Sequence, residues 1–327
     1  MVNQTPKEAA RAMTRMAAQR EAFFFLWDFE GRQPVVCSWE EAARQGIFFW
    51  MDGISNAPAV VAVSEPLQWG FDPVPWPCYA QSFAVVQTGL QRGDSFLTNL
   101  TCRTPLHTNY TLEQLFGQAK ARFKLLMQDR LVSFSPEAFV CIRGERIATF
   151  PMKGTIDAHL PRAAECILND PKEAAEHATI VDLLRNDLSQ VAEQVRVARY
   201  RYLDCLTTHR GQLLQVSSEI VGRVGKDFWD KLGENFLRLL PAGSISGAPK
   251  TKTCQIIRAA EGQERGYFTG VFGYYDGEKL ESAVLIRFIE RDPNGRLYFR
   301  SGGGITAQSQ AQMEYQEMNQ KIYAPIY

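Results

Sequence analysis

Two short turn sequences in the last third of the chain constrain the fold most. Asp276-Gly277 and Asn294-Gly295 each separate segments rich in β-branched and aromatic residues. Dipeptides of this kind between apolar runs are the strongest short-range signal for a β-hairpin. Strands are therefore expected around them, at 271–275, 281–289 and 297–300. Strands joined by hairpins pair in antiparallel fashion, so this part of the chain predicts an antiparallel sheet.

The rest of the chain mixes strand-like and helix-like segments, with few β-α-β alternations. Apolar spacing predicts further strands at 23–29, 59–63, 96–100, 131–134, 138–142, 146–149 and 213–221. It predicts helices at 39–46, 79–93, 112–127, 172–191, 228–240 and 251–260. The proline-rich stretch 65–77 is expected to be a packed surface loop. No low-complexity linker divides the chain, which favours an α+β fold in a single large domain, 1–327.

Composition excludes several classes of partner. The 36 basic and 36 acidic residues cancel, so no global field would attract nucleic acid or an anionic membrane. No apolar run approaches the ~20 residues that a membrane span needs. The seven cysteines are scattered without a Cys-x-x-Cys pair. This pattern predicts reduced thiols and a cytoplasmic location.

The pentapeptide Pro151-Met152-Lys153-Gly154-Thr155 places one primary amine between a proline and a glycine. We expect a turn here, directly after the strand at 146–149. Partial desolvation in such a turn would lower the pKa of Lys153 toward a nucleophilic form. Taken alone, the pentapeptide favours an ordinary surface lysine in a tight turn.

The C-terminal segment offers a glycine run, Ser301 to Ile305, between a strand and a helix. Glycines there let main-chain N–H groups approach an anion closely. Ser309 and Gln312 have the spacing of a capping box, which would begin the helix. On that helix Glu314, Glu317 and Lys321 form one stripe. The carboxylates could share Mg²⁺, with Glu176 of the 172–191 helix as a third, or could simply form a solvated face.

Other catalytic patterns fail. The segment 241–250 resembles a phosphate-binding loop, but the spacing from Gly243 to Gly247 is too short for a Walker A motif. It remains an anion-friendly turn before a helix. The four histidines lack zinc-ligand spacing, and no Gly-x-Ser-x-Gly elbow is present.

The order of these motifs resembles that of the chorismate-utilising enzymes, and within them the branch that forms aminodeoxychorismate. The resemblance covers roughly residues 79–327, whereas residues 1–78 match loosely. It implies an α+β fold with a core of antiparallel β-sheets covered by helices, like that of anthranilate synthase component I. The motifs that carry it are Ser135-Pro136-Glu137, 151–155, Glu176-His177, 181–187, 241–250, 301–305, 314–317 and Lys321.

The resemblance also implies a substrate and a cofactor. Mg²⁺ would be held by Glu176 and Glu317, with Glu314 reaching it directly or through water. The two carboxylates of chorismate would lie against that ion and against cationic and main-chain N–H groups, as suits a dianion. The residues implied in binding substrate are Gly154, Thr155, Phe268, Arg287, Gly302, Gly303, Gly304 and Lys321.

Two residues would carry the chemistry. Glu137 matches the general acid that protonates the departing 4-hydroxyl, which requires a raised pKa. Lys153 distinguishes the branch: its amine would add to the ring and ammonia would then displace it. Anthranilate-, isochorismate- and salicylate-forming relatives typically lack this lysine. Leu97, Gln215 and Phe268 depart from the usual pattern and put substrate affinity in question.

The resemblance further implies partners. The chain has no glutaminase signature, so ammonia would come from a separate glutamine amidotransferase subunit, and a separate aminodeoxychorismate lyase would act downstream. Two alternatives stay open. The chain could be an anthranilate synthase component I, against which Lys153 argues. It could also be a non-catalytic anion-binding subunit with the same fold, although every expected catalytic position is filled.

Overall fold

The computed structural model describes residues 4–59, 63–208 and 211–326. Within these ranges the strands form two nine-stranded sheets, and every pair in them is antiparallel. The first sheet runs β11-β13-β10-β9-β16-β15-β1-β2, with β12 beside β13. Its strands are β1 (Phe23–Trp27), β2 (Val35–Cys37), β9 (Ala138–Arg143), β10 (Arg146–Thr149), β11 (Met152–Asp157), β12 (Glu193–Thr208), β13 (Gly211–Arg223), β15 (Val271–Tyr275) and β16 (Lys279–Val284).

The second sheet runs β14-β6-β18-β17-β8-β7-β3-β4, with β5 beside β6. Its longest strand pair is β6 and β18, in register from Leu297 opposite Leu106 to Ile305 opposite Thr98. Its strands are β3 (Ile47–Met51), β4 (Ile54–Ser55), β5 (Trp69–Phe71), β6 (Leu97–Thr108), β7 (Phe123–Met127), β8 (Leu131–Ser135), β14 (Gly247–Ala248), β17 (Phe288–Arg291) and β18 (Leu297–Ile305).

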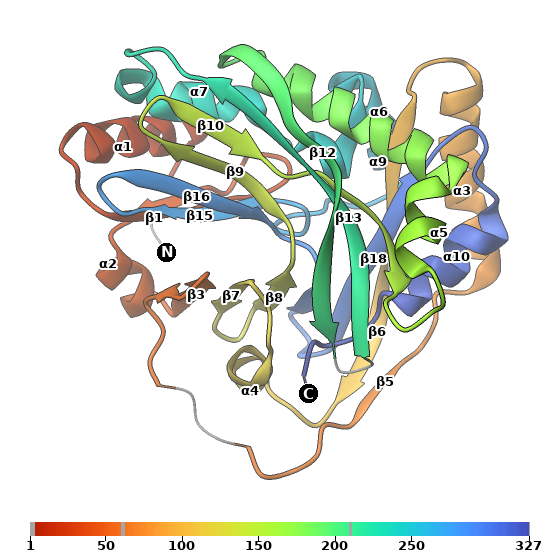
Figure 1. Ribbon diagram of the computed structural model, residues 1–327. Helices are drawn as coiled ribbons and strands as arrows, with labels where there is room; N and C mark the ends of the chain where they lie inside the picture. Colours follow the sequence, from red (N-terminus) through yellow and green to blue (C-terminus); the bar gives the residue numbers. More distant parts are fainter. Residues whose placement is uncertain (1–3, 60–62, 209–210, 327) are drawn as a thin grey trace.

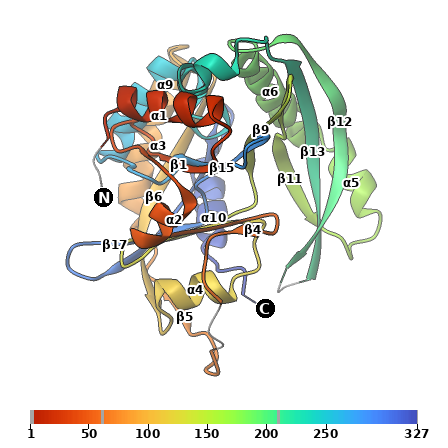
Figure 2. The same ribbon diagram turned by 90° about the vertical axis from the view of Figure 1, so that its left-hand side faces the viewer.

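Helices cover the outer faces of both sheets (Figure 1). In the view of Figure 2, α6 and α5 lie along the β11–β13 side of the first sheet, away from α4 at the end of the second sheet. The helices are α1 (Pro6–Ala18), α2 (Trp39–Arg44), α3 (Trp76–Gln91), α4 (Leu112–Gln118), α5 (Ala163–Asn169), α6 (Pro171–Leu188), the 3₁₀ turn η1 (Trp229–Lys231), α7 (Leu232–Leu239), α8 (Gly243–Ser246), α9 (Lys250–Glu261) and α10 (Ala311–Gln320).

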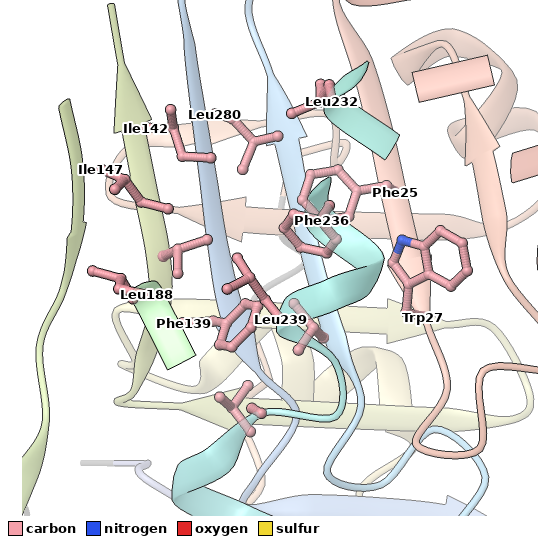
Figure 3. Close-up of a cluster of buried hydrophobic side chains, with 14 of the residues drawn as sticks. Phe25, Trp27, Phe139, Ile142, Ile147, Leu188, Leu232, Phe236, Leu239 and Leu280 are labelled. Carbon is pink, nitrogen blue, oxygen red and sulfur yellow. The ribbon is translucent and has the colours of Figure 1, made fainter. Parts of the chain in front are cut away.

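The largest apolar core lies between the first sheet and helices α1, α6 and α7 (Figure 3). Phe25 from β1 meets Phe236 from α7 edge to face, with ring centroids 5.0 Å apart. Each fully buried phenylalanine contributes roughly 1.5–3 kcal/mol through area removed from water. Leu188 of α6 belongs to the same core, so this packing also fixes the helix that carries Glu176.

The fold class predicted from the sequence is confirmed, and most predicted elements are present. The helix predicted at 112–127 is present only in its first part: α4 ends at Gln118, and residues 123–127 form β7 instead. All five residues of β7 are buried, because the strand is central in its sheet and covered on both faces. When every residue of a segment is buried, apolar and polar residues do not alternate with the period of a strand or of a helix, so the sequence pattern cannot distinguish the two.

Other differences are smaller. The strand predicted at 281–289 is interrupted, since β16 ends at Val284 and β17 begins at Phe288. The predicted surface loop 65–77 contains the short strand β5, and the long strand β12 was not predicted. Most of the strand predicted at 59–63 lies outside the described residues.

No helix in the described ranges is long and apolar enough to cross a membrane. The seven cysteines are free thiols, and no two of them form a disulfide among the described residues. Cys37 is the buried member of the set, and burial raises its pKa to about 12. That thiol is therefore protonated and unreactive at neutral pH.

Candidate active site

Lys153 lies at a β-bulge in β11. This strand pairs with β13, and its register shifts between Met152 and Thr155. Gly154, inside the irregularity, has φ +86°, a conformation that favours glycine. The turn predicted for the pentapeptide is therefore wrong, because these residues continue a strand. A bulge re-aims the side chains beside it, which is how β11 can present Lys153 to a helix.

The side chain of Lys153 meets Glu176 on α6. Its Nζ lies 2.8 Å from Glu176 Oε2, and the two side chains are 28% and 18% exposed. Helix α6 begins at Pro171, where the Asp170 side chain accepts the N–H of Glu173 and caps the helix. Lys172, one turn before Glu176, places its Nζ 3.7 Å from the other carboxylate oxygen. Glu176 is therefore shared between two cations.

The charge state of Lys153 differs from the one predicted. Burial alone would lower the pKa of Lys153, but attraction by Glu176, Glu317 and Glu173 outweighs it and the net direction is upward. The predicted lowering is therefore wrong for the protein without ligand, in which Lys153 is an ammonium group. A nucleophilic role requires that this proton leave first.

Helix α10 supplies two further carboxylates. Glu314 is buried and accepts a hydrogen bond from Ser309 Oγ at 2.8 Å. Burial and the charge of Glu317 raise the pKa of Glu314 despite that bond. Glu317 lies 2.6 Å from Lys321 Nζ. The capping box predicted at Ser309 is wrong, because Gln310 occupies the N-cap position without a side-chain hydrogen bond and the Ser309 hydroxyl bonds Glu314.

The glycines Gly302, Gly303 and Gly304 lie within β18, where they pair with β6. A Cβ at Gly303 would come within 3.5 Å of both Glu314 Oε2 and Lys321 Nζ, and within 3.9 Å of Glu317 Oε1. Lys321 also donates a hydrogen bond to the Gly302 carbonyl at 3.1 Å. The glycine strand and the charged face of α10 thus enclose a common space that a side chain would partly fill.

Glu137 follows β8 and is held at several points. Its N–H donates to Ser135 Oγ at 3.1 Å, and its carbonyl accepts the N–H of Val284 at 3.1 Å. The carboxyl accepts a 2.5 Å hydrogen bond from Ser244 Oγ. Burial raises the pKa of Glu137, although Ser244 and the Arg287 charge oppose the rise. A raised pKa suits a carboxylic acid that donates a proton near neutral pH.

Arg287 occupies the break between β16 and β17. Its φ of 52° is unusual for a residue with a side chain and marks backbone strain. The guanidinium lies over the ring of Tyr323, 5.1 Å from its centroid. Burial is the main cause that lowers the pKa of Lys321; the charge of Arg287 adds to that lowering and opposes the rise in the pKa of Glu137, so Arg287 is close to both groups. Arg287 therefore links the Glu137 region with the α10 carboxylates.

Thr155 and Phe268 lie less centrally. Thr155 is exposed on β11, opposite Gln215 of β13. Phe268 is buried in the core, with its ring centroid 5.7 Å from that of Phe288. Among the described residues, no hydrogen bond or ring contact joins either side chain to the carboxylate cluster. Leu97 is buried in β6, and its Cδ1 would lie 3.0 Å from a Cβ at Gly304.

Two residues of this region were not predicted from the sequence. Glu173 is one turn before Glu176, and its Oε2 lies 2.7 Å from the position of a Cβ at Gly154. Its spacing of three from Glu176 was a usable signal. Ser244 lies within the predicted anion-friendly turn 241–250, but nothing in that pattern indicates a partner as distant in sequence as Glu137.

Several buried polar atoms around this region have no hydrogen-bond partner within the described part of the chain. Buried polar atoms are normally paired, so each of these needs an explanation. They lie on α6, β13, β18 and the break between β16 and β17, the elements that carry the candidate residues. A polar ligand would satisfy them. The atoms are Glu173 Oε2, Gln215 Oε1, Ser217 Oγ, Arg287 Nε and Ser301 Oγ.

The candidate magnesium residues Glu176, Glu314 and Glu317 offer carboxylate oxygens, which are the ligands that a hard cation prefers. Within the described ranges, no three His, Cys, Asp or Glu side chains are close enough together to hold a metal ion by themselves. Mg²⁺ usually takes only one or two carboxylates and completes its shell with water and substrate oxygens. Glu314 and Glu317 both border the space beside Gly303, and Glu176 and Glu317 both act on Lys153. The carboxylate set is therefore compatible with one Mg²⁺.

The sequence and the fold match known proteins along most of the chain. A family model described as chorismate binding enzyme matches residues 5–327. An uncharacterized PabA-like protein of Haemophilus influenzae is 48% identical over 100% of this chain and 99% of its own length. Aminodeoxychorismate synthase component 1 of Escherichia coli is 31% identical over 75% of this chain, and the match spans 56% of that protein.

A solved structure agrees with this result. The crystal structure of anthranilate synthase component I from Streptococcus pneumoniae superposes with a TM-score of 0.65 at 27% identity. The superposition covers 79% of this chain and 59% of the other. The match of the family model over nearly the whole sequence and the superposition lead to one conclusion. The chain belongs to the chorismate binding enzyme family.

Proposed function

We propose that the protein aminates chorismate with ammonia to form 4-amino-4-deoxychorismate, a step toward p-aminobenzoate and folate. The observation that carries this proposal is the position of Lys153, whose amine lies 2.8 Å from Glu176 and within the field of Glu317. A lysine beside the carboxylate cluster would supply the nucleophile for a covalent intermediate. Such an intermediate distinguishes the aminodeoxychorismate-forming branch from its relatives.

The names of relatives support the family more strongly than the reaction. The chain resembles both an aminodeoxychorismate synthase component 1 and an anthranilate synthase component I. Lys153 favours the first reaction over the second, because anthranilate-forming relatives typically lack a lysine at this position. The reaction therefore depends on one residue, and a single substitution tests it.

The substrate would be held by groups that suit two carboxylates. Arg287 offers an unpaired buried Nε, Lys321 offers an ammonium group, and the backbone of β18 at Gly302–Gly304 allows close approach. Glu176 and Glu317, with Glu314 nearby, would hold Mg²⁺. When bound, that ion would neutralise the substrate carboxylates. Thr155 and Gly154 of β11 would border the ring substituents.

The proposed chemistry divides one displacement into two. The neutral amine of Lys153 forms a C–N bond at ring carbon 2 while the 4-hydroxyl takes a proton from Glu137 and leaves as water. Ammonia then forms a C–N bond at carbon 4, and the bond to Lys153 breaks. After proton transfers that restore Glu137 and Lys153, the net change is chorismate plus ammonia to 4-amino-4-deoxychorismate plus water.

The proposal implies partners that this chain does not supply. Ammonia would come from a glutamine amidotransferase subunit, and a separate lyase would convert the product to p-aminobenzoate. We propose a cytoplasmic location, where the free thiols would stay reduced.

Product identification tests the proposal. Purified protein is incubated with chorismate, Mg²⁺ and ammonium salts, and the products are separated and identified by mass. We expect 4-amino-4-deoxychorismate, and loss of its formation in the Lys153→Ala variant. An anthranilate product would replace the proposed reaction with the second candidate. Undiminished turnover in Lys153→Ala would remove the covalent mechanism, and no turnover by the native protein would favour a non-catalytic binding role.

A further inference from the structure

The contact between Ser244 and Glu137 joins two segments that lie far apart in the sequence. Ser244 Oγ donates to Glu137 Oε1 at 2.5 Å, which is short for a hydroxyl–carboxyl hydrogen bond. The backbone of Glu137 is already fixed through Ser135 and Val284. The remaining freedom of Glu137 is the rotation of its side chain, and this is the freedom that the bond from Ser244 restricts.

Ser244 can act in this way because its own segment is anchored on one side by a buried ion pair. Arg265 and Glu261 are each 1% exposed and lie 2.6 Å apart. Arg265 Nη1 donates at 3.0 Å to the carbonyl of Ile245, the residue after Ser244. Its Nη2 donates at 2.7 Å to the carbonyl of Asn99 in β6. The pair therefore ties α8 to strand β6 of the second sheet.

A second ion pair anchors the other side of the segment. Lys250 Nζ lies 3.0 Å from Asp187 Oδ2 of α6 and donates to the Leu239 carbonyl at 2.9 Å. Gly243 packs so closely against Leu183 and Asp187 that a Cβ would overlap both side chains. The segment is therefore held against α6 with little room to shift, and Ser244 is presented from a rigid support.

We propose that Ser244 is a positioning residue for Glu137, which fixes the carboxyl so that Oε2 carries the proton and delivers it to the departing hydroxyl. A serine hydroxyl that donates to Oε1 uses that oxygen as an acceptor, so the proton of the neutral acid resides on Oε2. The contact therefore selects both the rotamer and the oxygen that bears the proton. This inference rests on the proposed function, in which Glu137 is the general acid.

The test compares Ser244→Ala with Ser244→Thr and with Ser246→Ala. Ser246 lies in the same short helix, but its hydroxyl donates to the Ala242 carbonyl and does not touch Glu137. In the amination assay we expect Ser244→Ala to lower kcat roughly 10- to 100-fold, part of what a general acid contributes, with KM for chorismate little changed. Ser244→Thr, which keeps the hydroxyl, should recover most of the rate. Ser246→Ala should retain near-native kcat.

A pH profile separates positioning from simple loss of structure. The hydrogen bond from Ser244 lowers the pKa of Glu137, so its removal raises that pKa. If the protonated acid is the active form, the alkaline limb of the kcat profile moves to higher pH in Ser244→Ala. A merely structural defect would lower the whole profile without moving the limb, and that result would overturn the inference.

The Glu137→Gln variant separates this inference from the proposed function. If Glu137→Gln keeps native activity, the general-acid role itself fails. If Glu137→Gln is impaired but Ser244→Ala is not, only the positioning role fails. We expect both single variants to be impaired and the double variant to be no worse than Glu137→Gln, since the serine then has no acid to position. An equal additional loss in the double variant would contradict the inference.

Discussion

The ammonium group of Lys153 lies 2.8 Å from a carboxylate oxygen of Glu176, although helix α5 intervenes between them in the chain. The bulge in β11 and the docking of α6 together produce this contact. It keeps the candidate nucleophile protonated in the absence of substrate. In the proposed mechanism the pair is a resting state, and the neutral amine forms when Mg²⁺ or substrate engages Glu176.

The first prediction concerns the reactivity of Lys153. Its raised pKa means that the ammonium form persists at mildly alkaline pH and that the neutral amine appears only as the pH rises further. An amine-selective reagent should therefore label Lys153 more slowly than the exposed Lys226, with labelling read by peptide mass spectrometry without Mg²⁺. Glu176→Gln removes the principal attraction, lowers the pKa of Lys153 and should accelerate its labelling. Equal labelling in both proteins would contradict the pairing.

The second prediction concerns Gly154. Alanine there would adopt a left-handed φ and place its Cβ 2.7 Å from Glu173 Oε2. Gly144 has a similar positive φ of 57° but open space around it, so Gly144→Ala is the matched control for backbone strain alone. We expect roughly 1–2 kcal/mol of destabilisation in the control and more in Gly154→Ala, measured by denaturant unfolding. Equal losses would show that Glu173 moves aside at no cost.

The third prediction separates two neighbouring glycines. A Cβ at Gly303 makes ordinary contacts with Glu314 and Lys321, whereas a Cβ at Gly302 overlaps the Leu100 carbonyl and the backbone of Thr101. Gly303→Ala should therefore fold with near-native stability but raise KM for chorismate, because it fills the proposed binding space. Gly302→Ala should lower the melting temperature. A Gly303→Ala protein with native KM would place the substrate elsewhere.

The fourth prediction concerns the proposed metal. Glu317→Gln removes one negative oxygen donor, so direct Mg²⁺ binding measured by calorimetry should weaken at least about tenfold, the lower end of what losing an outer-shell partner costs. Glu234 is exposed on α7, and Glu234→Gln provides a control for the change in net charge. If both variants bind Mg²⁺ as the native protein does, Glu317 is not a ligand.

The sequence predicted local features well where hydrophobic period and turn chemistry agreed. The strand at 271–275 matches β15, and the helix at 251–260 lies within α9. The prediction failed where complete burial removed the hydrophobic periodicity, as at Lys124 and its apolar neighbours in β7. It also failed at Ser309, whose hydroxyl bonds Glu314 instead of capping the helix. Whether the Ser309 hydroxyl caps the helix or bonds Glu314 depends on the path of the preceding loop, and the spacing of residues in the sequence does not determine that path.

The candidate site was predictable as a set of residue types but not as a geometry. Glu314, Glu317 and Lys321 share a helix, so helical spacing was enough to group them. The contacts from Lys153 to Glu176 and from Ser244 to Glu137 depend on strand pairing and helix docking between distant segments. The sign of the Lys153 pKa shift followed from the first of these contacts, and for that reason sequence reasoning predicted it wrongly.

Because of the irregularity at Gly154, the direction of the Lys153 side chain depends on the number of residues between Met152 and Thr155. Successive side chains in a regular strand alternate between faces, so a one-residue change of register exchanges them. Deleting the codon of Gly154 would restore an uninterrupted ladder and disturb the orientation of Lys153, with the other motifs intact. Among related chains, a single-residue gap at this point would therefore deserve as much weight as a substitution of the lysine itself.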